Sequence, residues 1–150
     1  MVIEKEAIKI INIKQYLKQY RSGLQELQEI TERIVAVRSQ AEKVTATLTG
    51  MPGAPAGTMS GDNLQRCIDM LDELERRYVD RLKETVQMLT SIEDGINVLS
   101  DERYRQVLRM RYISGASWPK IAAEMNYTER QAQNLHGRAL QALEALKNIS

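Results

Sequence analysis

The sequence has few of the residues that build disulfides, aromatic cores and rigid turns. Its 150 residues include no phenylalanine, one tryptophan, three prolines and one cysteine. A lone cysteine cannot form a disulfide within the chain, and secreted domains of this size often depend on such bonds. No apolar run approaches the roughly 18 residues that suggest a membrane span, and the first residues lack a signal-peptide pattern. We therefore expect a cytoplasmic protein with no membrane contact.

Residues that carry catalysis or bind metals are equally scarce. His136 is the only histidine and has no cysteine or histidine at metal-ligand spacing, while Cys67 fits a small buried residue. The glycine-rich "TGMPGAPAG" is not followed by the Lys-Ser/Thr of a phosphate-binding loop, and the carboxylates of "DELE" and "EDG" follow a helical surface pattern. The sequence predicts no enzyme, no cofactor and no metal site.

What the chain does contain is mainly good helix formers, with apolar residues at steps of three and four. One such pattern runs from Ile13 to Leu48 and a second from Leu64 to Leu99, and the glycines and prolines of residues 50–61 separate them. Two long helices of this kind can bury their apolar stripes as an antiparallel coiled-coil hairpin. Because the hairpin has little core of its own, we expect residues 1–99 to form a homo-oligomer or to contact a partner.

Residues 100–150 predict three shorter helices. Ser100 can cap the first and Gly115 marks its end; Ser117 can cap the second, whose first turn tolerates Pro119. Asn126 suits a left-handed chain reversal, and Thr128 can then cap the third helix. The predicted inward positions are Tyr104, Val107, Leu108 and Tyr112 on the first helix, Trp118, Ile121, Ala122 and Met125 on the second, and Ala132, Leu135, Ala139, Leu143 and Leu146 on the third. Two closely linked helices with this spacing indicate a helix-turn-helix.

The outward face of the last helix favours binding of duplex DNA. Arginine can donate a fork to guanine, asparagine and glutamine can pair with adenine in the major groove, and glycine permits close backbone approach. The base-reading candidates are Arg130, Gln131, Gln133, Asn134 and Gly137. The candidates for contact with the DNA backbone are Ser117, Lys120, Thr128, Arg138, Arg105 and Arg109. His136 flanks this face, where we expect a solvated residue, with contact to DNA as the alternative.

The segment "RQVLRMRYISGASWPKIAAEMNYTERQAQNLHGRALQAL" resembles region 4 of bacterial sigma factors. The whole chain is similar to phage-encoded regulators of the ArpU and RinA late-transcription type. This resemblance implies transcriptional control of phage or prophage late genes in a bacterial host, with duplex DNA and RNA polymerase as partners. The sequence departs from the sigma pattern at Glu129, Gln131 and Gln133, where basic residues are common, so recognition of the promoter −35 element is not implied.

Two other functions fit the same pattern. A small terminase-like subunit for phage DNA packaging can also join a helix-turn-helix to oligomerising helices, and a coiled-coil adaptor need not bind DNA. Oligomer mass separates packaging rings from regulators, and salt-sensitive duplex binding separates both from an adaptor. The formal charge of −2 on residues 1–100 and +3 on residues 101–150 agrees only weakly with a DNA-binding C-terminal part. The leading prediction is a sequence-specific DNA-binding regulator with domains 1–99 and 100–150.

Overall fold

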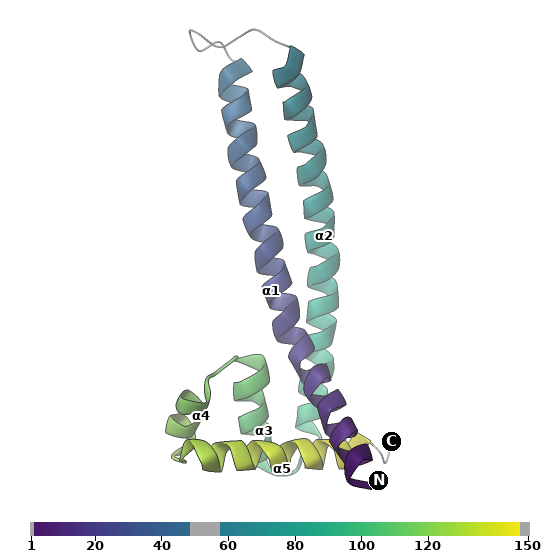
Figure 1. Cartoon of the computed structure of the whole chain (residues 1–150), viewed down its shortest axis with the longest axis vertical. Helices are drawn as coiled ribbons and strands as arrows, with labels where there is room; N and C mark the ends of the chain where they lie inside the picture. The colour runs from purple at the N-terminus through teal and green to yellow at the C-terminus, as the bar shows by residue number, and fades with distance from the viewer. Residues whose placement is uncertain (1, 49–57, 148–150) are drawn as a thin grey trace. The chain divides into compact units, whose positions relative to one another are not determined.

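The computed structural model describes residues 2–48 and 58–147, and within these ranges it contains helices and no strands. Figure 1 shows the two long helices side by side and antiparallel, so the predicted all-α hairpin followed by shorter helices is confirmed. The elements are α1 (Val2–Leu48), α2 (Thr58–Asn97), α3 (Glu102–Leu108), the π-helix η1 (Arg109–Ile113), α4 (Trp118–Met125) and α5 (Glu129–Lys147). The predicted turn at 50–61 lies largely outside the described residues, and α2 already begins at Thr58.

The chain divides into two compact units. The first joins residues 1–22 to residues 85–150, and the second is residues 23–84. The described residues of the second unit belong to α1 and α2. Its buried residues are Ile30, Val37, Cys67 and Leu74, with Ile34, Ala41, Leu71 and Tyr78 packed against them. Exposed ion pairs join Arg38 to Glu75 and Arg81 to Glu26 across the helix pair, and such pairs add little to stability.

The side of α2 that is buried differs in part from the predicted side. Cys67 and Thr85 are buried, whereas Ile68 and Leu82, which the pattern placed inward, are 42% and 40% exposed. The exposed Val79 and Val86 lie near the same side of the helix as Ile68 and Leu82. The apolar pattern of α2 is therefore wider than the stripe that α1 covers. We call Ile68, Val79, Leu82 and Val86 the outer stripe.

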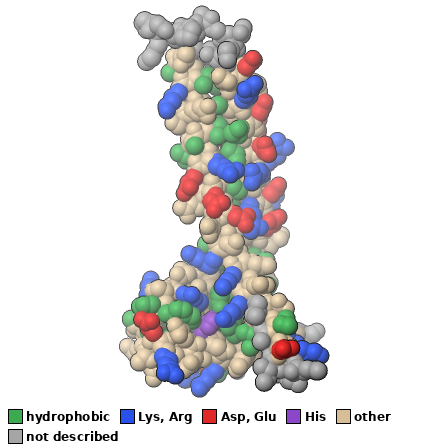
Figure 2. Space-filling model, viewed as in Figure 1, with side chains coloured by type: hydrophobic (Ala, Val, Ile, Leu, Met, Phe, Trp, Pro, Cys, Tyr) green, Lys and Arg blue, Asp and Glu red, His purple; other side chains and the backbone are tan. Residues whose placement is uncertain are grey.

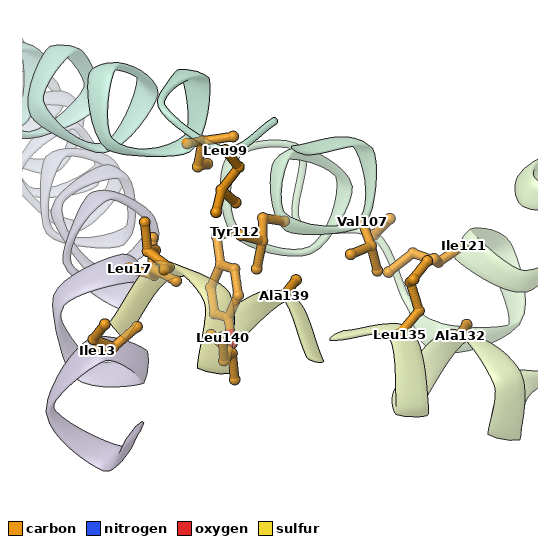
Figure 3. Packing of buried hydrophobic residues seen from close by; sticks show 14 of the residues in the cluster. Ile13, Leu17, Leu99, Val107, Tyr112, Ile121, Ala132, Leu135, Ala139 and Leu140 are labelled. Carbon is orange, nitrogen blue, oxygen red and sulfur yellow. The ribbon is translucent and has the colours of Figure 1, made fainter. Parts of the chain in front are cut away.

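The first unit has a separate core in which the ends of the hairpin meet the C-terminal helices. Ile13 and Leu17 of α1, with Ile92, Ile96 and Leu99, belong to the same buried cluster as Tyr112 and Leu140. Figure 3 shows Ile13 and Leu17 reaching towards Leu140 while Val107 and Ile121 pack near Leu135. The C-terminal helices therefore share one core with the ends of both long helices.

This extra layer changes the faces of α5. Ala132, Leu135, Ala139 and Leu143 are buried as predicted, but Leu146 is exposed. Leu140 and His136 are buried as well. The buried side of α5 is therefore wider than the predicted stripe, because residues of α1 and α2 share its core with α3 and α4. The prediction of a solvated His136 was wrong.

The start and end of the helix before α4 also differ in detail from the sequence pattern. Asp101, and not Ser100, is the N-cap of α3, and its carboxylate accepts a 2.9 Å hydrogen bond from the backbone N–H of Arg103. After Leu108 the helix widens into η1, where the Ser114 N–H donates to the Arg109 carbonyl five residues earlier. Gly115, with φ +70°, then ends the helix as predicted.

Candidate nucleic-acid interface

The helix-turn-helix geometry is set by local capping. The Ser117 hydroxyl accepts from the Lys120 N–H at the start of α4, and Asn126 ends α4 in a left-handed conformation with φ 57°. At the start of α5, the Thr128 hydroxyl accepts from the Gln131 N–H at 3.1 Å, while the Gln131 side-chain oxygen accepts from the Thr128 N–H at 2.9 Å. This reciprocal pair is a capping box. The caps predicted at Ser117, Asn126 and Thr128 are confirmed.

The capping box bears on two candidates for DNA contact. Thr128 and Gln131 are both exposed, yet each uses an oxygen to satisfy a backbone donor at the start of α5. The amide nitrogen of Gln131 and the hydroxyl proton of Thr128 remain as donors. Both residues can therefore still donate to DNA, although they do so from positions that the cap determines.

The N-terminal half of α5 presents a polar face to solvent. Arg130, Gln133 and Asn134 are exposed, and within the described residues Arg130 forms no ion pair with a neighbouring glutamate. A Cβ added at Gly137 would meet nothing within 4 Å, so the backbone there is open to a close approach. We call Arg130, Gln133, Asn134 and Gly137 the polar face of α5. Its donors and acceptors are free for base edges.

One side of the polar face borders a shallow depression of about 220 Å³. Asp101, and after it the Tyr127 hydroxyl, raise the pKa of the Arg103 guanidinium above its ordinary value. Arg103 therefore stays charged at the edge of this depression, near Arg138. Two permanent cations beside a polar helix face suit phosphate groups. The lining residues are Arg103, Tyr127, Gln131, Asn134, Leu135 and Arg138.

The other side of α5 holds a buried aromatic network. The Tyr112 hydroxyl lies 2.6 Å from Nε2 of His136, and the Trp118 ring meets the imidazole edge-on with centroids 5.0 Å apart. The Arg111 guanidinium lies 4.5 Å from the centre of the Trp118 ring, and its Nη1 donates to the Ala116 carbonyl. These contacts connect η1, α4 and α5. They therefore help to set the orientation of α5 relative to α4.

Two of the arginines that were predicted to contact the DNA backbone form hydrogen bonds within the protein. The Arg105 guanidinium donates to the Leu99 carbonyl, and the Arg109 guanidinium donates to the Asn97 side-chain oxygen. Both arginines therefore bond the end of α2 to the following helix. Ser117 and Lys120, by contrast, are exposed at the start of α4.

This is the arrangement that the comparison with protein families matches. Residues 101–143 match the family of sigma-70, region 4. The comparisons with curated proteins and with solved structures gave no match. The region-4 match supports a sigma-like helix-turn-helix in this part of the chain and suggests a DNA-binding regulator. It spans α3 to most of α5 and excludes both long helices.

The charge of the two units supports the same location for DNA binding. The first unit carries 13 basic and 9 acidic residues, whereas the second carries 8 and 11. The first unit is therefore at +4 and the second at −3. A division at residue 100 conceals this contrast, because basic residues of α1 belong to the first unit. A sequence signal exists for it: residues 7–25 and 103–123 contain no aspartate or glutamate. Arg103 and Arg111 lie in the second of these segments and were not among the predicted DNA contacts.

Within the part of the chain that the structure describes, no three His, Cys, Asp or Glu side chains gather as a metal site would require. None of the described helices combines the length and apolarity needed to cross a bilayer.

Proposed function

We propose that this protein is a sequence-specific, duplex-DNA-binding transcriptional regulator that inserts α5 into the major groove. The observation that carries the proposal is the polar face of α5, which is exposed and is held by a capped helix-turn-helix of the sigma region-4 type. In this motif the N-terminal part of the second helix contacts base edges. We further propose control of phage or prophage late genes in a bacterial host, with RNA polymerase as a partner.

Individual residues take different parts in this proposal. Arg130, Gln133 and Asn134 read bases, Gly137 permits close approach, and Gln131 donates from the edge of the capping box. Ser117, Lys120, Thr128 and Arg138 contact phosphates. We add Arg103 to this group because it lines the same depression as Arg138. Since Arg105 and Arg109 are bonded to the end of α2, we assign them mainly to holding the domain together.

The long helices provide self-association in this proposal. The outer stripe of α2 leaves four aliphatic side chains exposed after α1 has packed, and burial of apolar surface is the main driving force for association. A second copy of the chain that covers this stripe forms a dimer with two DNA-binding units. A dimer also suits regulators, whereas packaging subunits form larger rings.

Selection of bound sequences from random duplexes, with the full chain, tests the proposal. We expect enrichment of a defined site. Failure to bind any duplex at low salt contradicts DNA binding, and binding without enrichment contradicts sequence-specific reading.

Arg130→Ala provides the sharpest version of this test. If the Arg130 fork meets a guanine, the variant loses about 1–3 kcal/mol at the selected site and loses preference at one base pair. Arg66→Ala is a matched control, because it removes an exposed arginine from the second unit, outside the helix-turn-helix. Competition with single-base site variants measures both effects. An Arg130→Ala protein with unchanged affinity and unchanged preference at every base pair shows that other residues read the site.

A further inference from the structure

The part of α1 that belongs to the first unit carries a row of basic residues. Lys14, Lys18 and Arg21 follow at steps of four and three, so they lie on one side of the helix. Lys18 and Arg21 are exposed and Lys14 is half-buried. The neighbouring Ile13 and Leu17 are anchored in the core that also holds Tyr112 and Leu140. We call Lys14, Lys18 and Arg21 the α1 basic row. This part of α1 belongs to the same compact unit as the helix-turn-helix.

The row lies beside the entry to the helix-turn-helix. The Arg21 guanidinium carbon is 2.5 Å from the position that a Cβ on Gly115 would occupy, so this cation sits against the loop that leads to α4. Gly115 is two residues before Ser117, the N-cap of α4. The row therefore reaches the edge from which Ser117 and Lys120 are proposed to contact phosphates.

The other end of the row lies near the aromatic network. Lys14 and Lys18 directly follow Ile13 and Leu17, which share a buried cluster with Tyr112. Burial, and after it the positive charges of Lys14, Arg111 and Lys18, lower the pKa of His136. Figure 2 shows Lys and Arg side chains gathered around the single histidine on this face. With residues 7–25 and 103–123 free of carboxylates, α1 and η1 contribute positive charge here that no acidic residue of either segment offsets.

We propose that the α1 basic row binds phosphates of the DNA backbone, as an extension of the phosphate contacts at the start of α4. The occupant is duplex DNA because the row is continuous with the Gly115–Lys120 edge and because its charge is complementary to phosphate. In a helix-turn-helix the first helix crosses the DNA backbone, and Arg21 of the row lies against the loop that leads to that helix, α4. This inference rests on the proposed DNA-binding function.

The test compares two variants that remove the same charges from the same helix. Lys18→Gln/Arg21→Gln alters the row, and Arg33→Gln/Lys43→Gln removes one arginine and one lysine from exposed positions of α1 in the second unit. Binding of the full-length proteins to a labelled duplex is measured over a range of salt concentrations. The logarithm of affinity falls with the logarithm of salt by about 0.9 for each phosphate contact. We expect the row variant to have a slope shallower by about two, and the control to keep the wild-type slope.

The single variant Lys18→Gln guards against loss of structure, because it leaves the Arg21 contact with Gly115 intact. It should reduce the slope by about one while the melting temperature stays at the wild-type value. For each row variant, affinity for the selected duplex and affinity for random duplexes should fall by the same factor.

The outcomes separate the two proposals. If wild type binds DNA and both row variants keep its slope and affinity, the inference about α1 is overturned while the proposed function stands. If the row variants instead lower only the oligomer mass, the row contacts an acidic surface of a second copy, which also overturns the inference. Wild-type protein that binds no duplex refutes the proposed function and this inference together.

Discussion

His136 offers a direct measurement of how tightly the helix-turn-helix is packed. It is 7% exposed and lies in the network with Tyr112 and Trp118. Burial, and then the positive charges of Lys14, Arg111 and Lys18, lower the pKa of His136 from 6.5 to about 4. The ring is therefore neutral in the folded protein at pH 7, and we predict that it makes stability dependent on pH.

The linkage between proton binding and folding gives the sign and size of the contribution of His136 to the free energy of unfolding. Between pH 6.5 and about 4 the unfolded chain binds a proton at His136 that the folded chain does not, so this contribution is complete above pH 6.5 and is lost as the pH falls towards 4. At about 1.4 kcal/mol per pKa unit, the full loss amounts to about 3 kcal/mol. That is a large fraction of the stability of a small domain.

Urea unfolding of wild type and His136→Leu across this pH range isolates the effect. At neutral pH we expect the variant to be less stable by about 1–3 kcal/mol, because the buried Tyr112 hydroxyl loses its partner. As the pH falls towards about 4.5 the wild type should lose about 2–3 kcal/mol more than the variant, so the gap should close. The double variant Tyr112→Phe/His136→Leu should recover part of the neutral-pH loss, since it removes the orphaned hydroxyl.

A constant difference between wild type and His136→Leu from neutral pH to pH 4.5 would refute this reasoning. It would mean that the imidazole titrates normally in the folded state and is therefore in contact with water.

Further expectations concern the polar face, the phosphate contacts and the hairpin. Gly137→Ala should stabilise α5 by about 1 kcal/mol yet weaken DNA binding, whereas Gly95→Ala, also without a neighbour within 4 Å, should leave DNA binding unchanged. Melting curves measure the stability of both variants, and anisotropy titrations measure their DNA binding. Unimpaired binding by Gly137→Ala would show that DNA does not approach the backbone at this position. Lys120→Ala or Arg138→Ala should weaken binding to all duplexes alike and make the salt slope shallower by about one, and a loss confined to the selected site would contradict a phosphate role. Leu27→Asp should unfold the second unit, because it places a charge at a position that is only 6% exposed. Leu82→Asp, at an exposed position of the outer stripe, should lower oligomer mass without lowering the stability of the single chain. The opposite pattern in sedimentation and melting would refute the assignment of Leu27 to the core and of Leu82 to self-association.

The local features of the helix-turn-helix could be predicted because short-range chemistry determines them. A hydroxyl at Ser117 or Thr128 can reach an N–H three residues ahead whatever surrounds it. Asn126 tolerates the left-handed conformation that its turn requires. The exposed positions Arg130, Gln133 and Asn134 follow from the 3.6-residue period once Ala132 and Leu135 are assigned to the core.

The direction in which each long helix packs, and what covers α5 from its second side, depended on tertiary structure. Periodicity shows that α2 has an apolar side, but that side is wider than one neighbouring helix can cover, so the pattern could not decide between Cys67 and Ile68 or between Thr85 and Leu82. In the same way, α5 alone does not reveal that Ile13 and Leu17, more than a hundred residues away, join the core with Leu140. That core also joins α1 to the unit that contains the helix-turn-helix, where Arg21 of the α1 basic row lies against Gly115. A side chain's burial depends on every element that approaches it, and helical periodicity records only its position on its own helix.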